Sequence, residues 1–100
     1  MYKLTVVGGP SQGTSYSLKE FGETSFGRGD NNDVVLPSAK VSKQHCVLVV
    51  SNKEVQVKDV GSSNGTFVNG QTRLKPQKPQ VLASGDELRL GDTFLKFILT

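Results

Sequence analysis

The sequence is poor in cysteine, histidine and tryptophan, since its 100 residues include one Cys, one His and no Trp. The lone Cys46 excludes an internal disulfide framework and suits a reducing compartment. His45 and Cys46 cannot supply the three or four protein ligands that a zinc site needs, so we expect no bound metal, and we expect no cofactor. We expect Cys46 to act as a small buried hydrophobic residue.

Long apolar runs are absent as well. No segment approaches the roughly 20 residues that a membrane-spanning helix needs. Residues 1–3 lead directly into an alternating segment, without the charged and apolar regions of a secretory leader. We therefore expect a cytoplasmic protein that has no membrane partner.

Positive charge exceeds negative charge only slightly. The formal net charge is +3 and the isoelectric point is about 9.2, which favours anionic partners without identifying one. We expect most of the cations to be solvated surface charges. No dense Lys/Arg stripe is interleaved with aromatic residues, so we expect no nucleic-acid partner. Much of the positive charge lies in three loose blocks, namely Lys40 with Lys43, Lys53 with Lys58, and Arg73 with Lys75 and Lys78.

No stretch shows a helix start followed by the i, i+3, i+4 apolar spacing of a helix. Alternation of apolar and polar residues, interrupted by Gly, Pro and Asn, instead predicts short strands. The predicted strands cover residues 3–7, 14–18, 23–27, 34–36, 46–50, 54–58, 66–68, 72–74, 81–82, 87–90 and 93–99. We expect residues 75–80 to form a loop or a sheet edge, because their two prolines cannot donate ladder hydrogen bonds.

This pattern predicts an all-β fold, an antiparallel β-sandwich of about eleven short strands. One hundred residues suffice for one domain with a modest core, so we assign residues 1–100 to a single domain. The last predicted strand runs to the end of the chain, which suggests a domain that is part of, or the N-terminal module of, a larger protein, although a complete small protein could also end here.

The segment 59–70 contains two Asn-Gly pairs, Asn64-Gly65 and Asn69-Gly70. Asn-Gly is the strongest short-range signal for a tight hairpin turn, because both residues tolerate positive φ. Hydroxyl side chains, including those of Ser63 and Thr66, crowd the first pair. The segment therefore predicts a turn that carries polar groups at its tip.

Two further polar clusters, residues 27–29 and residues 42–45, could meet this turn at one end of the sandwich. Arg28 can donate two parallel hydrogen bonds to one phosphate and stays charged at any relevant pH. Its flanking glycines allow a tight turn and a close approach of a ligand. Ser42 offers a hydroxyl and Lys43 a point charge, although each residue alone could equally be a turn or surface residue.

Four blocks of the sequence resemble, in order, the pattern of the forkhead-associated (FHA) domain family. The blocks are residues 26–29, 32–36, 41–45 and 59–70, and residues 85–86 and 88–91 resemble the late hairpin of that family. One block would be weak evidence, but four in order make the resemblance specific over nearly the whole chain. The resemblance implies an eleven-stranded β-sandwich whose loops at one end bind phosphothreonine in partner proteins. It also implies a Ser/Thr kinase upstream and a role in signal transduction.

The resemblance also implies which residues contact the phosphopeptide. The phosphate would be bound by Arg28, Ser42 and Lys43. The hydroxyl of Ser63 would contact the phosphate or the peptide, and Asn64 would bind the peptide main chain. Lys40 would contact acidic residues after the phosphothreonine. Many family members have Thr in place of Ser63, and Ser keeps the hydroxyl but loses the methyl group.

A second set of residues is implied as structural support: Gly27, His45, Gly65, Thr66 and Asn69. In the family the histidine ring hydrogen-bonds loop backbone and so fixes the loop that carries Ser42. A nucleophilic Ser42 with His45 as its base would need a partner carboxylate, an oxyanion hole and a nucleophile-elbow context, and no elbow pattern surrounds this serine. We therefore expect no catalytic residue and no enzymatic activity.

One alternative function stays open from the sequence. The same sandwich could be an assembly module that binds an unphosphorylated partner through a sheet face. Arg28, Ser42 and Asn64 are all present, which disfavours a degenerate phosphate pocket and makes phosphothreonine binding the preferred interpretation.

Overall fold

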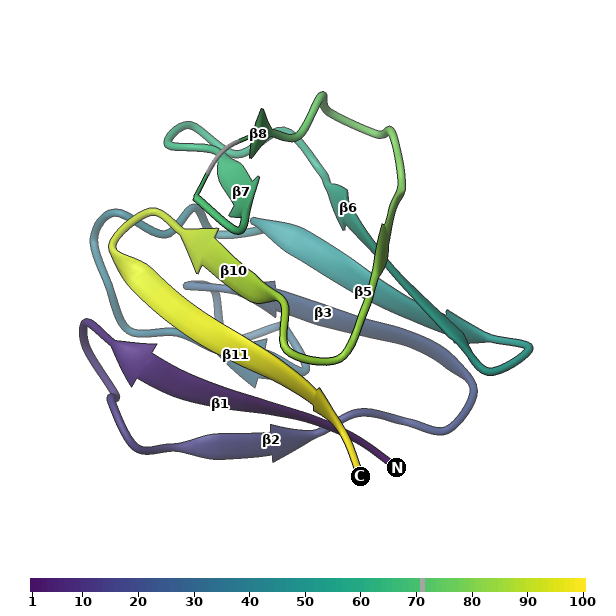
Figure 1. Cartoon of the computed structure of the whole chain (residues 1–100). Helices are drawn as coiled ribbons and strands as arrows, with labels where there is room; N and C mark the ends of the chain where they lie inside the picture. The colour runs from purple at the N-terminus through teal and green to yellow at the C-terminus, as the bar shows by residue number, and fades with distance from the viewer. Residues whose placement is uncertain (71) are drawn as a thin grey trace.

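The computed structural model describes residues 1–70 and 72–100, and in these residues it contains eleven strands and no helix (Figure 1). Consequently no described segment is a helix that could span a membrane. Every strand end lies within one residue of its predicted position, which confirms the strand assignment. The strands are β1 (Tyr2–Gly8), β2 (Ser15–Ser17), β3 (Gly22–Gly27), β4 (Val34–Val35), β5 (Cys46–Ser51), β6 (Glu54–Asp59), β7 (Thr66–Val68), β8 (Thr72–Arg73), β9 (Gln80–Leu82), β10 (Glu87–Leu90) and β11 (Thr93–Leu99).

The strands form two sheets that pack face to face, as the β-sandwich prediction requires (Figure 1). One sheet has the order β2-β1-β11-β10-β7-β8 and the other the order β4-β3-β5-β6-β9. All pairs are antiparallel except β3 with β4, where Phe26 lies opposite Val34 in a parallel register. The residues between β3 and β4 therefore leave the end of β3 and return beside it.

Alternation along the strands places the core between the sheets. In β5, Cys46, Leu48 and Val50 are buried while the residues between them are partly exposed, because successive side chains of a strand point to opposite faces. Phe26 and Phe97 are the largest fully buried side chains. Burial raises the pKa of the Cys46 thiol, and the residue is the small buried hydrophobe that the sequence predicts.

Strand register brings the three polar clusters to one end of the sandwich, on the left in Figure 1. Cys46 at the start of β5 lies opposite both Phe26 of β3 and Asp59 of β6. In the other sheet, Thr66 at the start of β7 lies opposite Leu90 at the end of β10. The loops that follow β3, precede β5 and follow β6 consequently share this end.

The two Asn-Gly pairs differ in conformation. Asn69 and Gly70 have φ values of 54° and 68°, as the predicted tight hairpin turn with positive φ at both residues requires. In the first pair only Gly65 has a positive φ, of 88°. The expectation of positive φ at both residues is thus wrong for Asn64, whose side chain instead donates to the Lys40 carbonyl of a neighbouring loop.

Candidate functional site

Three loops make up the candidate site: the Arg28 loop (residues 28–33), the Ser42 loop (residues 36–45) and the Asn64 loop (residues 60–65). Two backbone hydrogen bonds join the first two, from the Arg28 N–H to the Ser42 carbonyl at 2.9 Å and from the Gly29 N–H to the Lys43 carbonyl at 3.1 Å. They hold Arg28 beside Ser42.

A glycine and an asparagine allow this close contact between the two loops. A Cβ atom on Gly27 would lie 2.3 Å from the Lys43 carbonyl oxygen, so only glycine fits there. The Asn32 Nδ2 donates to the carbonyls of Lys43 and Gly29, at 2.6 Å and 2.8 Å. Asn32 thereby fixes the Arg28 loop from inside.

The Arg28 guanidinium is held in place but exposed. Its Nε–H donates to the Val41 carbonyl at 3.0 Å, which orients the group. Neither terminal nitrogen makes a hydrogen bond within residues 1–70 and 72–100, and the side chain is exposed. A guanidinium oriented in this way can give its terminal N–H groups to one anion without first losing rotational freedom.

The buried His45 ring connects the Ser42 loop to the Asn64 loop. Its Nδ1 accepts a hydrogen bond from the Ser42 N–H at 3.1 Å, and its Nε2 lies 2.8 Å from the Gly65 carbonyl oxygen. Because Nδ1 accepts, the proton must be on Nε2, which then donates to Gly65. Burial lowers the pKa of His45, so the ring is neutral at neutral pH and keeps this tautomer.

Ser42 contributes a hydroxyl group that can donate a hydrogen bond to a ligand. Its Oγ accepts the Ser63 N–H at 3.0 Å, and its own hydroxyl proton has no acceptor within the described residues. That proton can therefore be donated to a ligand oxygen. The half-buried Ser42 side chain lies between the Arg28 loop and the Asn64 loop.

Asp59 organises the base of the Asn64 loop. The carboxylate accepts the N–H groups of Gly61 and Ser62 at 2.7 Å and 3.0 Å, the Thr66 hydroxyl at 2.7 Å and the Ser62 hydroxyl. Burial alone would raise the pKa of Asp59, but these hydrogen bonds outweigh it and lower the pKa below 3.8. The carboxylate is thus ionised and holds the loop against β7.

The Asn64 side chain joins the Asn64 loop to the Ser42 loop from outside. Its Nδ2 donates to the Lys40 carbonyl at 2.8 Å, while Oδ1 accepts no hydrogen bond within the described residues. The exposed Oδ1 and the second Nδ2 proton can therefore contact an extended peptide. The Lys40 side chain is exposed, and its backbone packs against Gly91, where a Cβ would lie 2.3 Å from the Lys40 carbonyl oxygen.

Comparisons with known proteins agree with this geometry. The family model "FHA domain" matches residues 24–91. This chain belongs to the FHA domain family. It is 39% identical over 95 residues to the glycogen accumulation regulator GarA of Mycobacterium tuberculosis, an alignment that covers 95% of this chain and 56% of GarA. It is 37% identical over 95 residues to the oxoglutarate dehydrogenase inhibitor of Corynebacterium efficiens, covering 95% of this chain and 63% of the inhibitor.

Solved structures also resemble this FHA domain. A structure from an analysis of phosphothreonine-dependent FHA domain interactions superposes with a TM-score of 0.84 at 30% identity, covering 99% of this chain and 96% of that one. The FHA domain described here spans only about half to two thirds of the length of the two curated relatives.

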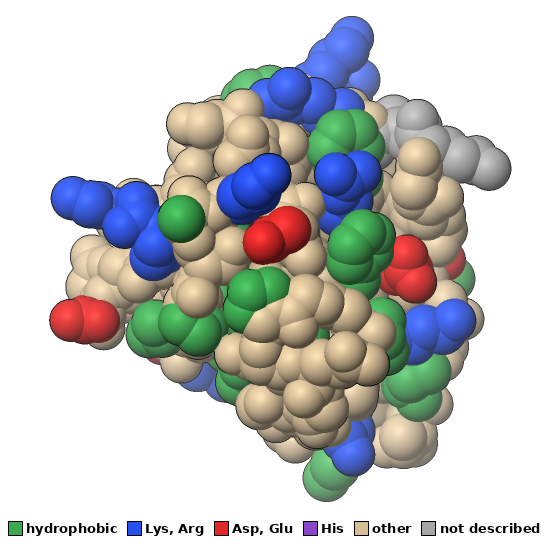
Figure 2. Space-filling view, turned by 90° about the vertical axis from the view of Figure 1, so that its left-hand side faces the viewer, with side chains coloured by type: hydrophobic (Ala, Val, Ile, Leu, Met, Phe, Trp, Pro, Cys, Tyr) green, Lys and Arg blue, Asp and Glu red, His purple; other side chains and the backbone are tan. Residues whose placement is uncertain are grey.

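The FHA domain brings most of the predicted residues together at one end. Lys43 and Ser63 are exposed on adjoining loops, and Thr66 is buried beneath them. Asn69 is the exception, because it follows the far end of β7. There its side chain donates to Asp86, which precedes β10, at 3.1 Å and accepts the N–H of Glu87, the first residue of β10, at 2.9 Å. Figure 2 shows the site end, where Lys and Arg side chains are more numerous than acidic ones.

Three residues of this FHA domain were not assigned a role from the sequence. Asn32 and Asp59 lie inside the recognised blocks, and the Asp-x-x-Ser spacing of Asp59 and Ser62 is a typical signal for a side chain that caps a turn. Arg73 carries no such signal. Its Nη2 donates to the Ser63 carbonyl at 3.2 Å, and its side chain covers Gly65, where a Cβ would lie 2.7 Å from the Arg73 Nε.

Proposed function

We propose that this FHA domain is a phosphothreonine-dependent binding module that recognises phosphorylated partner proteins. The single observation that carries the proposal is the pairing of two free donors on neighbouring loops. The Arg28 guanidinium is oriented by Val41 with its terminal nitrogens exposed, and the Ser42 hydroxyl retains its proton.

Phosphothreonine matches these donors chemically. It carries about −1.5 to −2 charges near neutral pH and three strong acceptor oxygens. Arg28 supplies a charged planar fork, Ser42 supplies a neutral donor, and the exposed Lys43 supplies a point charge. The mechanism is electrostatic attraction with directed hydrogen bonds, and no bond is made or broken.

The Asn64 loop supplies the peptide contacts in this proposal. Asn64 presents its Oδ1 and one Nδ2 proton to the peptide main chain, and Ser63 presents a hydroxyl to the phosphate or the peptide. In this proposal the exposed Lys40, whose carbonyl accepts the Asn64 hydrogen bond, attracts an acidic residue after the phosphothreonine.

We further propose that the domain is not an enzyme and acts in the cytoplasm, on proteins that a Ser/Thr kinase has modified. The two curated relatives carry the names of a regulator and an inhibitor, which fits a binding function. The buried His45 supports this view, because both ring nitrogens are occupied by loop backbone and cannot serve as a base for Ser42.

A peptide-library screen tests the proposal. Libraries centred on phosphothreonine, phosphoserine, glutamate and unmodified threonine are compared against the wild-type domain. We expect enrichment only with a phosphorylated centre, and stronger enrichment with phosphothreonine. Equal enrichment of unmodified threonine would instead support the alternative of a phospho-independent assembly module.

A further inference from the structure

One short segment outside the proposed phosphothreonine site carries positive charge and no acidic residue. The whole chain has 12 Lys and Arg residues and 9 Asp and Glu residues. Residues 73–80 contain three of the cations and none of the acids, so the rest of the chain carries equal numbers of each. The three cations of this segment are Arg73, Lys75 and Lys78.

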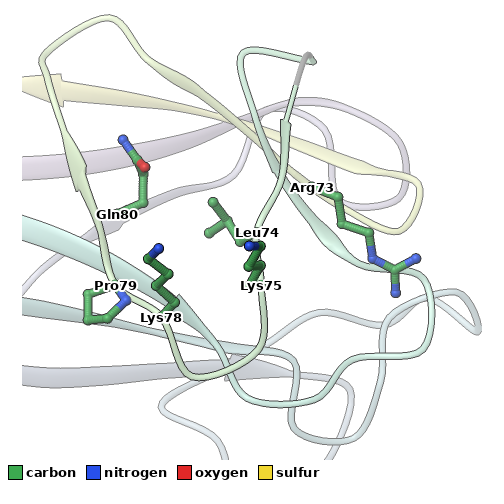
Figure 3. Close-up of a pocket in the computed structure, with 6 residues that line it drawn as sticks. All are labelled: Arg73, Leu74, Lys75, Lys78, Pro79 and Gln80. Carbon is green, nitrogen blue, oxygen red and sulfur yellow. The ribbon is translucent and has the colours of Figure 1, made fainter.

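The three cations border one hollow of about 180 Å³, lined by Arg73, Leu74, Lys75, Lys78, Pro79 and Gln80. Figure 3 shows Lys75 and Lys78 beside this hollow, while the Arg73 guanidinium points away from it, toward the Asn64 loop. No carboxylate is among the residues that line the hollow. The positive charges of Lys75 and Lys78 are thus not neutralised by any residue that lines the hollow.

A hydrogen-bonded turn joins the backbones of the two lysines. The Lys78 N–H donates to the Lys75 carbonyl at 3.1 Å, with Pro76 at the second position and Gln77 at the third. Gln77 has a positive φ of 66°, as the third residue of a type II turn requires, although glycine usually occupies it. Two like charges at the ends of one turn repel each other, and an anion bound between them would relieve the repulsion.

Two anchors hold this turn against the structure. Leu74 is buried, and its N–H donates to the Thr66 carbonyl at 2.8 Å. The Gln77 N–H donates to the Asp59 carbonyl at 2.7 Å. The lysines are therefore presented by a fixed backbone, which lowers the entropy lost when they bind a ligand.

The same anchors connect the turn to the proposed phosphothreonine site. Asp59 holds the turn through its carbonyl and the Asn64 loop through its carboxylate. Arg73 links the turn to the Asn64 loop as well, because its Nη2 donates to the Ser63 carbonyl. A peptide that crosses the Asn64 loop toward Arg73 would consequently reach Lys75 and Lys78.

We propose that Lys75 and Lys78 form a second anion site, which binds an acidic or phosphorylated side chain of the same partner that presents phosphothreonine to Arg28 and Ser42. The inference rests on the proposed function. Exposed charge pairs contribute little alone, about 0–1 kcal/mol each, so two lysines would not retain a free anion. An anion tethered through the bound phosphothreonine has a high effective concentration, and the two contributions then add to affinity.

Calorimetric titration with designed peptides tests the second site. One peptide contains a single phosphothreonine among neutral residues. Two series add a second phosphothreonine or a glutamate about two to eight residues to either side, a span of up to roughly 3.3 Å per residue. We expect at least one second position to strengthen binding about tenfold, which corresponds to two exposed charge pairs in the upper half of their usual range of about 0–1 kcal/mol each. The two series distinguish a phosphate from a carboxylate ligand.

Matched variants assign the gain to the two lysines. Lys75→Gln with Lys78→Gln should remove the tenfold gain and leave the affinity for the singly phosphorylated peptide within about twofold. Lys3→Gln with Lys53→Gln changes the charge equally at exposed sites on other parts of the molecule and should keep the gain. Arg28→Ala should lose binding of both kinds of peptide.

Three results would overturn the inference. The first is a gain in affinity that survives loss of both lysines. The second is that no second position of the anion raises the affinity. In both cases the singly phosphorylated peptide binds normally. The third is a filter-binding assay in which the lysines are required for nucleic acid but not for the doubly anionic peptide. If the singly phosphorylated peptide fails to bind the wild type, the proposed function itself fails, and the second site fails with it.

Discussion

Replacing His45 by Leu should loosen two of the three site loops at once. The substitution removes the acceptor for the Ser42 N–H and the donor for the Gly65 carbonyl, whose hydrogen bonds measure 3.1 Å and 2.8 Å. A buried backbone group left without a partner costs about 1–3 kcal/mol. Gly65 is buried, while Ser42 is half-buried and can recruit water, so we expect a total loss of about 2–4 kcal/mol in the free energy of unfolding.

Urea unfolding of the wild type and His45→Leu measures this loss, with equal m-values as the condition for comparing them. Gln44→Leu is the matched control, because its side chain is exposed one residue away, and its effect should stay within about 0.5 kcal/mol. Phosphothreonine peptides should also bind His45→Leu more weakly. A loss below about 0.5 kcal/mol for His45→Leu would refute the role assigned to the histidine.

The same histidine predicts a dependence of stability on pH. Burial lowers the pKa of His45 below its ordinary value of 6.5, so the unfolded chain binds a proton at a higher pH than the folded chain does. This contribution to stability is complete above pH 6.5 and is lost as the pH falls toward the folded pKa. Stability measured between pH 7.5 and pH 5, conditions chosen to bracket that value, should fall in the wild type. His45→Leu should lose this component, and an unchanged slope would contradict the assignment.

Two further substitutions test the Asn64 loop. Gly65→Ala should lower the free energy of unfolding in urea by about 2–3 kcal/mol, because φ is +88° and the new Cβ would meet Arg73. Gly61→Ala, at φ +103° with nothing within 4 Å of the new Cβ, should cost only about 1–2 kcal/mol of backbone strain. Equal losses would exclude the steric contact with Arg73. Asp59→Asn should destabilise the domain by about 2–4 kcal/mol at pH 7. It should also remove the part of the stability loss that the wild type shows as the pH falls below 3.8. If this variant loses stability in acid as much as the wild type does, the result would argue against the Asp59 network.

The strands could be predicted because each repeats apolar residues with a period of two between clear turn signals. The alternation of buried residues in β5 follows directly from this pattern. The parallel pairing of β3 with β4 could not be predicted, because it depends on how residues 28–33 return beside β3. Alternation reports which face of a strand is buried and says nothing about the direction of its neighbour.

The site was predictable to a different extent for each loop. Arg28 and Ser42 stand in recognisable blocks, and strand register brings these blocks to one end. The conformation of Asn64 was predicted wrongly, because propensity for a turn does not anticipate its hydrogen bond to Lys40, 24 residues away in sequence. Arg73 was assigned only to a solvated block, since its contact with Ser63 exists only once β7 and β8 pair.

The central claim is that Arg28 binds the phosphate of phosphothreonine, and calorimetry with one peptide in phosphorylated and dephosphorylated form tests it most directly. Wild type should bind only the phosphorylated form. Arg28→Ala should show no measurable binding. Because this variant also loses the hydrogen bond to the Val41 carbonyl, its free energy of unfolding should fall by about 1 kcal/mol and its melting temperature by roughly 4–8 °C. Equal binding of both peptide forms by the wild type, or undiminished binding by a folded Arg28→Ala, would contradict the claim.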